Sequence, residues 1–182
     1  MWAEKDLLKI LVKQEDIRRR AVELGAEITR DYKAEGKNPL LVALLKGSVP
    51  WLTDISRNID LDISVDYMDV SSYEGTHSTG DIRIVKDLDV SIKGVDILLV
   101  EDIVDTGKTI KEVLKNFYMR GASSVKIVTL LDKPSGRVND VKADYIGFEI
   151  ENEFVVGYGL DFNQHYRCLP FVGVLKPECY ER

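Results

Sequence analysis

The sequence predicts an α/β fold in which a parallel sheet carries helices on both faces. Three stretches are rich in apolar residues, two of them without a break, which is typical of strands buried in a parallel sheet. Amphipathic stretches with helical spacing alternate with these strands. Short strands without helices come last, and they predict a small hood subdomain. The apolar runs are residues 40–45, 97–100 and 125–131, and two amphipathic stretches are residues 14–34 and 110–119.

The other elements follow from the same patterns. The first predicted helix ends near Gly36 and Pro39, and the strand after it runs into a Lys-Gly turn and a helix through Trp51 and Ile59. Residues 63–70 alternate apolar and polar side chains, as a half-exposed strand does, and residues 82–85 return from the loop that follows. The later short strands are predicted at residues 145–148, 154–159 and 171–175.

Length and composition indicate a single soluble domain. The 182 residues suffice for a full core at about 14–131, with about 132–182 adding the hood. The formal net charge of −6 argues against a general nucleic-acid binder. No apolar run approaches a membrane span, and residues 1–13 lack a signal-peptide core. Cys168 and Cys179 lack the spacing of a zinc site, so we expect free thiols and a cytoplasmic location.

A loop of small residues follows the central strand. Because Thr106, Gly107 and Thr109 are small, backbone N–H groups can point into a concavity at the start of the next helix. Unpaired amide donors and the helix dipole both favour an anion at such a place. Ligands of open α/β sheets bind beyond the carboxyl ends of the strands. The segment from Asp105 to Thr109 therefore predicts a phosphate site.

Two adjacent carboxylates precede that loop. Glu101 and Asp102 are acceptors suited to a sugar diol, or to Mg²⁺ through its waters. A ligand with a phosphate at one end and a vicinal diol a short distance away would satisfy both features. The motif therefore favours a ribose 5-phosphate.

Two other interpretations of the loop compete with this one. Gly107-Lys108-Thr109 is the ending of a P-loop, but that motif needs glycine five positions earlier, where this chain has Asp102. A nucleoside triphosphatase is rejected on that ground. In the structural alternative, Asp105 caps the helix and the acidic pair is solvated. We expect that Asp105 can cap the helix, but capping alone leaves the two carboxylates at the end of a buried strand unexplained.

Three further places can carry chemistry. The Lys46-Gly47 turn, between a strand and a helix, is a weak signal for an anion site. Residues 71–81 form a long polar loop, which is typical of a functional lid or of plain disorder. Lys133 follows a buried strand, and Pro134 favours an extended backbone at the preceding residue. A lysine in that position can project into a site at the strand ends.

The segment from Val100 to Thr109 resembles the phosphoribosyl-diphosphate motif of the type I phosphoribosyltransferases. The flanks, from about Leu40 to Pro177, are similar to the branch of that family that uses 6-oxopurines. The resemblance implies transfer of a 5-phosphoribosyl group from 5-phospho-α-D-ribose 1-diphosphate to N9 of hypoxanthine or guanine, with Mg²⁺ as cofactor and pyrophosphate as product. It also implies a homodimer or homotetramer that acts on small molecules, with neither nucleic acid nor membrane as partner.

The resemblance also implies roles at the purine end. Asp105 would be the general base near the purine N7, acting by its charge as much as by proton transfer. Lys133 would donate to the carbonyl group at purine position 6. Phe154 would stack on the purine, and the backbone of Val155 would read its edge.

At the other end, the resemblance implies contacts with the diphosphate. Lys46 and Gly47 would contact it through a turn whose Leu45–Lys46 peptide is cis, and Arg167 would meet the same group. Ser72 and Tyr73 would close a lid over it. Mg²⁺ would be held by Glu101, Asp102 and Asp161, and the ribose phosphate by Glu101, Asp102, Thr106, Gly107, Lys108 and Thr109.

A second class of function is a regulator on the same fold that senses the sugar diphosphate and binds RNA or DNA. The acidic balance and the absence of a basic run in the sequence count against it.

Overall fold

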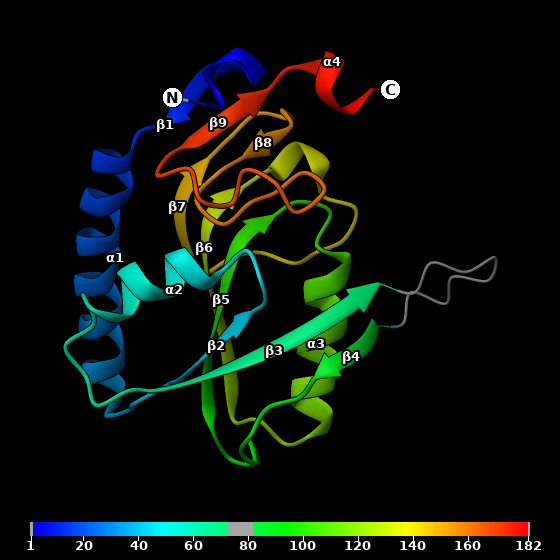
Figure 1. The fold of residues 1–182 in the computed structure, drawn as a ribbon. Helices are drawn as coiled ribbons and strands as arrows, with labels where there is room; N and C mark the ends of the chain where they lie inside the picture. The colour runs from blue at the N-terminus through cyan, green and yellow to red at the C-terminus, as the bar shows by residue number, and fades with distance from the viewer. Residues whose placement is uncertain (1, 73–81, 182) are drawn as a thin grey trace.

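The computed structural model describes residues 2–72 and 82–181, and within them it has a six-stranded sheet in the order β4-β3-β2-β5-β6-β7. Strands β2, β3, β5, β6 and β7 are parallel, and the edge strand β4 is antiparallel to β3. Figure 1 shows the sheet between its helices. The strands are β2 (Leu40–Leu44), β3 (Ser64–Ser72), β4 (Ile82–Lys86), β5 (Asp96–Val104), β6 (Ser124–Asp132) and β7 (Tyr145–Glu149).

Helices cover both faces of this sheet, as predicted. Along β5, Leu98 and Val100 belong to one hydrophobic cluster, together with α1 and α2. Ile97 and Leu99 belong to a second cluster, together with α3. Successive residues of a strand point to opposite faces, so one apolar run supplies both cores. The helices are α1 (Gln14–Glu35), α2 (Val49–Ser56) and α3 (Lys108–Met119).

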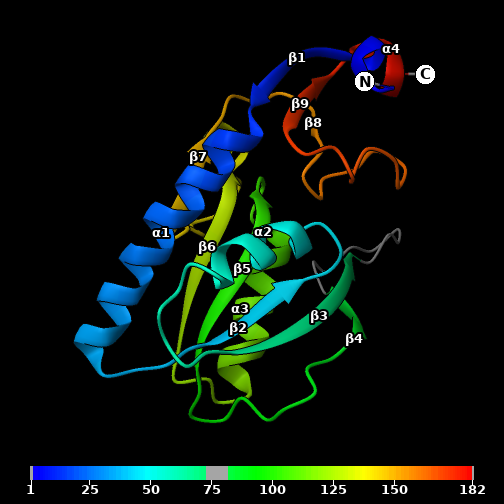
Figure 2. The same ribbon diagram turned by 60° about the vertical axis from the view of Figure 1, so that its left-hand side comes forward.

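A second sheet forms the hood, by which we mean β1, β8, β9 and residues 157–171. In the described part of the chain its three strands pair antiparallel in the order β1-β9-β8. In Figures 1 and 2 it lies above the upper end of the main sheet, beside the short C-terminal helix α4. The bounds are β1 (Leu7–Val12), β8 (Val155–Val156), β9 (Val172–Leu175) and α4 (Pro177–Tyr180), with single 3₁₀ turns at Glu4–Asp6 and Pro134–Gly136.

The hood differs from the prediction in three respects. The strand predicted at residues 145–148 is β7, which pairs parallel with β6 at the edge of the main sheet and is not part of the hood. Strand β1, near the N-terminus, is not among the predicted elements. The strand expected at residues 154–159 is much shorter, since the backbone turns at Gly157, Tyr158 and Gly159, which all have positive φ. The hood packs onto the α1 side of the sheet, because Val12, Val155, Val172 and Val174 share the cluster of α1 and α2.

The remaining differences concern element ends. Helix α2 ends at Ser56, before the predicted Ile59, while α1 ends as expected at Gly36, which adopts the left-handed conformation. The predicted lid at residues 71–81 falls largely outside the described residues. Tyr73 is among the residues left out, and Ser72 is described only as the last residue of β3.

Candidate functional site

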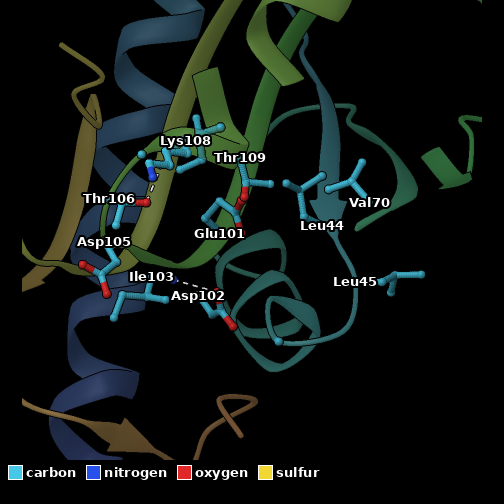
Figure 3. A pocket seen from close by; sticks show the side chains of 13 residues that line it. Leu44, Leu45, Val70, Glu101, Asp102, Ile103, Asp105, Thr106, Lys108 and Thr109 are labelled. Carbon is cyan, nitrogen blue, oxygen red and sulfur yellow. Dashed lines mark hydrogen bonds between the residues drawn. The ribbon is translucent and has the colours of Figure 1, made fainter. Parts of the chain in front are cut away.

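A cavity of about 240 Å³ lies at the carboxyl ends of β2 and β5, where the sequence placed the site. Figure 3 shows the side chains that line it. Most residues of the predicted motif are among them, together with Gly47 from the turn after β2. The complete lining is Leu44, Leu45, Gly47, Val70, Glu101, Asp102, Ile103, Asp105, Thr106, Gly107, Lys108, Thr109 and Ile110.

The phosphate loop, residues 105–109, leads into α3 with free amide donors. Gly107 is the N-cap of α3 with φ 76°, a conformation that glycine adopts at little cost. Gly107 has no side chain that could cap the helix, and the Lys108 amide donates to the hydroxyl of Thr106 over 3.4 Å. The N–H groups that follow Lys108 in the first turn are available to an anion. The expectation that Asp105 caps α3 was wrong, because the cap position falls two residues later.

Glu101 and Asp102 lie inside β5, because the strand continues to Val104. Their side chains therefore leave the strand in opposite directions, as Figure 3 shows. Glu101 points toward Thr109, and Asp102 points toward the start of α2. The two carboxylates face different parts of the cavity instead of forming one diad.

Burial dominates the electrostatics of this pair. Removal from water raises the pKa of Asp102 from 3.8 to about 6, although the backbone N–H of Ile103 and the charge of Arg167 act in the opposite direction. Burial also raises the pKa of Glu101 well above its ordinary value, and the charge of Asp102 adds to that increase. The free protein thus holds two carboxyl groups that are costly to ionise.

The turn after β2 fits closely against Asp102. A Cβ atom on Gly47 would lie 1.6 Å from a carboxylate oxygen of Asp102, and one on Gly159 would lie 1.9 Å from the carbonyl oxygen of Gly47. Only glycine permits these approaches, so the hood, the turn and β5 meet here. The Leu45–Lys46 peptide is cis, as the resemblance implied. Lys46 itself does not line the cavity and is exposed.

Arg167 and Asp161 reach this corner from the hood. Arg167 pairs with Asp161 at 2.7 Å between nitrogen and oxygen, and it donates to the carbonyl oxygen of Gly159 over 2.7 Å. Both charges influence the pKa of Asp102. Among the described residues, no three His, Cys, Asp or Glu side chains are placed to hold a metal together. The structure therefore does not gather Glu101, Asp102 and Asp161 into one coordination shell.

Lys133 lies beside Asp105 at the edge of the cavity. Its ammonium nitrogen is 3.1 Å from a carboxylate oxygen of Asp105, and its side chain is 8% exposed while that of Asp105 is 44% exposed. The backbone N–H of Lys133 donates to the carbonyl oxygen of Val104 over 3.0 Å. Lys133 is therefore not a solvated surface lysine, since its side chain is buried beside the phosphate loop.

Val155 begins β8 of the hood, Phe154 immediately precedes it, and neither residue lines the cavity. The ring of Phe154 is 38% exposed, so it is not a core aromatic. It stacks on Tyr180 with centroids 4.6 Å apart and meets Phe162 edge-on at 5.8 Å. Val155 is buried and pairs with Val174 of β9.

Sequence reasoning missed some of the site. Apolar residues of the cavity wall were not singled out; they are Leu44, Leu45, Val70, Ile103 and Ile110. For Ile103 a signal existed, because it lies between two predicted site residues. Arg137 was also missed. It hydrogen-bonds to the backbone of the phosphate loop, and nothing in its sequence context marks it.

Comparison with known proteins agrees with this geometry. The family model for the phosphoribosyl transferase domain matches residues 9–163. Hypoxanthine-guanine phosphoribosyltransferase of Streptococcus thermophilus is 52% identical over 180 residues, covering 98% of this chain and 99% of the relative. The enzyme of that name from Bacillus subtilis is 50% identical over 177 residues, covering 97% of each chain. A crystal structure of a hypoxanthine phosphoribosyltransferase from Staphylococcus aureus has a TM-score of 0.94 at 47% identity, covering 100% of this chain and 98% of that one.

The fold and the loop define a phosphoribosyltransferase, and the chain belongs to that family. The relatives named above are, more particularly, purine phosphoribosyltransferases that match it over nearly its whole length. Within the described residues, no helix is both long and apolar enough to span a membrane.

Proposed function

We propose that this protein is a hypoxanthine-guanine phosphoribosyltransferase of purine salvage. It would transfer the 5-phosphoribosyl group to N9 of hypoxanthine or guanine, giving IMP or GMP and pyrophosphate. The observation that carries the proposal is the cavity in which the amide-lined phosphoribosyl loop meets the Asp105–Lys133 pair. This pair presents an acceptor and a donor side by side. A 6-oxopurine presents the matching N7–H donor and carbonyl acceptor on one edge.

In this proposal the phosphate loop fixes the 5-phosphate through the free amides at the start of α3, together with Thr106 and Thr109. The ribose hydroxyls lie along the end of β5, within reach of the carboxylates of Glu101 and Asp102. Such binding places C1 of the sugar at the cavity mouth. Positioning of this kind accounts for much of the rate gain in a group transfer.

The purine is held by side chains from the other half of the molecule. Lys133 donates to the carbonyl at position 6, Phe154 stacks on one face of the ring, and the backbone of Val155 contacts its edge. As N9 bonds to C1, the C1–diphosphate bond breaks and the N7 proton passes to Asp105. The lysine leaves its ion pair with Asp105 to meet the base, so base binding frees the carboxylate for this step.

The leaving pyrophosphate is stabilised by positive charge and backbone donors. Arg167 and the Lys46–Gly47 turn converge on the corner where Asp102 lies, and they are the groups that would hold it. Ser72 and Tyr73 are proposed to close over the substrate and exclude water.

The residues present fit a Mg²⁺ ion that binds together with the substrate. Asp102 and Asp161 supply hard oxygen ligands, while Mg²⁺ usually keeps several waters and takes substrate phosphate oxygens. Glu101 lies on the far side of β5, so it is left to the ribose hydroxyls. When bound, the ion would neutralise charge on the leaving diphosphate. The protein need not gather three carboxylates in advance, because the substrate completes the ligand set.

We further propose that the 182 residues act as one domain in a cytoplasmic homodimer or homotetramer, with small molecules as its only substrates. The family resemblance supports the oligomer. The shared hydrophobic cluster of sheet and hood supports the single domain.

The deciding experiment is a spectrophotometric assay of the purified protein with the sugar diphosphate, Mg²⁺ and each purine in turn. We expect hypoxanthine and guanine to be converted, with one pyrophosphate released per nucleotide formed. Equal use of adenine would refute the 6-oxopurine assignment, and absence of turnover with every purine would refute the enzyme. The regulator alternative has no observation in its favour, and a mobility shift with RNA or DNA that persists at moderate salt would be needed to revive it.

A further inference from the structure

We propose that Arg137, with Asn139, is a positioning residue that sets the conformation of the phosphate loop without touching substrate. We name residues 137–141 the brace, because they lie behind that loop and bind its backbone. The inference rests on the proposed function for its kinetic consequences, but its structural basis is independent of which base is used.

The guanidinium group of Arg137 joins four acceptors. Its Nε donates to the carbonyl oxygen of Asp105 over 2.8 Å, and Nη2 donates to that of Val104 over 3.2 Å. Nη2 also pairs with the carboxylate of Asp132, and Nη1 donates to the carbonyl oxygen of Val141. The side chain is 12% exposed. A planar fork of fixed donors suits this task, and a lysine ammonium cannot reproduce it.

The next carbonyl of the loop is held by the same segment. Thr106 accepts hydrogen bonds from the backbone N–H of Val138 over 3.2 Å and from the side-chain amide of Asn139 over 3.0 Å. The oxygen of that amide accepts from the N–H of Val141 over 3.0 Å, which orients it. Three successive carbonyl groups, those of Val104, Asp105 and Thr106, thus face the brace.

This arrangement has a direct consequence for the cavity. With those carbonyls bound on the outer side, the orientation of each following peptide N–H is fixed as well, since the peptide unit is planar. The N–H groups oriented in this way are those of Asp105, Thr106 and Gly107. Asp105 is the candidate base, and Thr106 and Gly107 begin the phosphate site. The brace also begins just after Lys133, so one short segment connects the base-reading lysine to the phosphate loop.

Arg137→Lys is the main test, because it keeps a charge beside Asp132 but loses the fork. Arg120→Lys is the matched control: Arg120 is also partly buried and pairs with Asp87 at 2.7 Å and with Asn116, away from the cavity. We expect kcat/KM of Arg137→Lys to fall about 100-fold. Both a lower kcat and a higher KM for the sugar diphosphate should contribute, with a melting temperature close to that of Arg120→Lys. An unchanged kcat/KM, or an equal fall in the control, would overturn the proposal.

Binding of ribose 5-phosphate, measured by calorimetry, tests the brace without turnover. We expect the affinity to be about tenfold weaker in Arg137→Lys and in Asn139→Asp, whose carboxylate cannot donate to Thr106. The control Arg120→Lys should bind as tightly as the wild type. If the wild type fails to convert any purine but these shifts appear, the proposed function fails and the brace stands. If the wild type turns over normally and both variants bind ribose 5-phosphate as tightly as the wild type, the brace proposal alone is overturned.

Arg137→Ala leaves room for a chemical rescue. A cavity of about 360 Å³ lined by Asp132, Arg137, Asn139 and Val141 among others adjoins the guanidinium group. We expect low concentrations of guanidinium chloride to restore part of the lost kcat in this variant, and to leave the wild type and Arg120→Ala unchanged. Failure of guanidinium to restore kcat, when the variant is folded by circular dichroism, would count against a positioning role.

Discussion

The proposed site has two sides that are built from different kinds of sequence, and only the phosphoribosyl side lines the cavity. The phosphoribosyl side comes from one stretch, in which β5, the phosphate loop and α3 follow one another. The other side comes from Lys133 after β6 and from hood residues at 154–167, placed by contacts between distant segments. The approach of Gly159 to Gly47 and the bond from Arg167 to Gly159 are examples. A continuous motif carries its own geometry, whereas a dispersed one depends on the whole fold.

The two sides also differ in how they are occupied before substrate binds. The phosphate loop offers unpaired amide donors, so it is ready for an anion. On the other side, Lys133 and Arg167 are already paired with Asp105 and Asp161, at 3.1 and 2.7 Å. Substrate must replace those partners there. Changes on the paired side should therefore alter selectivity and kcat, and changes on the phosphoribosyl side should alter affinity for the sugar diphosphate.

The largest expected effect is in base selection at Lys133. An ammonium group only donates, so adenine, with an amino group at position 6, would leave a buried charge unpaired. Sites built on such a hydrogen bond reject a mismatched analogue by about 10⁴-fold. Lys133→Gln has a side chain that both donates and accepts. Its kcat/KM with hypoxanthine should fall and the gap to adenine should narrow, as measured by parallel assays of the two bases.

Lys126→Gln provides the matched control for that substitution. Lys126 also lies on β6 and is paired, with Glu35 at 2.8 Å, but toward the other end of the strand. Its removal should leave the ratio of hypoxanthine to adenine efficiency unchanged. A wild type that converts hypoxanthine and adenine equally well would contradict base selection by Lys133.

The next effect concerns Asp105. Asp105→Asn keeps the shape of the side chain and the backbone of the phosphate loop, but it removes the proton acceptor and the partner of Lys133. Loss of a general base costs about 10²- to 10⁴-fold in rate. Pre-steady-state and steady-state kinetics should show that fall in kcat, with affinity for the sugar diphosphate kept. An unchanged kcat would show that the carboxylate has no part in the chemistry.

Part of the fold could be predicted from the sequence. The apolar runs at β2 and β5 and the amphipathic helices predicted the sheet and its covered faces, because burial imposes those patterns. Hydrophobic periodicity did not single out β1 in the hood. It carries no information about Arg137, whose bonds to Val104 and Asp105 join residues 33 and 32 positions apart. Contacts of that kind arise only once the chain has folded.

The acidic pair illustrates the same limit within a motif. Adjacency of Glu101 and Asp102 suggested one shared task, but residence in a strand sends the two side chains in opposite directions. The pleat of β5 decides this: the sequence predicted the pair at the end of that strand, whereas the strand continues to Val104. Both residues of the pair line the cavity, and the direction of each side chain decides which part of the cavity it faces.

A third prediction uses that division. Asp102 faces the corner of Gly47 and Arg167, so Asp102→Asn should raise KM for the sugar diphosphate and weaken its dependence on Mg²⁺. Glu101→Gln should raise KM with little change in the Mg²⁺ dependence, since its carboxylate faces Thr109. Loss of one charged hydrogen-bond acceptor corresponds to about 10- to 100-fold in affinity. Initial rates over a grid of Mg²⁺ and substrate concentrations would separate the two, and identical profiles would contradict the division.

The smallest effect is on stability. Replacing the acidic pair should impair substrate binding but make the folded protein more stable at neutral pH. Burial raises the pKa of Asp102 from 3.8 to about 6, so the folded protein binds this proton more tightly than the unfolded chain. The stability that this carboxyl group contributes is complete below its unfolded pKa and is lost as the pH rises toward and past 6. Glu101, whose pKa is also raised, acts in the same direction. At neutral pH the wild type therefore carries an electrostatic cost that serves the site.

The double variant Glu101→Gln, Asp102→Asn should remove that cost. Without Mg²⁺ we expect its melting temperature to exceed that of the wild type by a few degrees at about pH 8, which corresponds to about 1–3 kcal/mol, and the difference to shrink toward about pH 4. Asp60→Asn is the control of opposite sign, because Lys33 lowers the pKa of that carboxyl group, so its loss should destabilise at neutral pH. Thermal unfolding across this pH range measures all three proteins. A double variant less stable than the wild type at neutral pH would mean that the two carboxylates stabilise the fold. The phosphoribosyl side would then depend on charged groups for its stability as the paired side does.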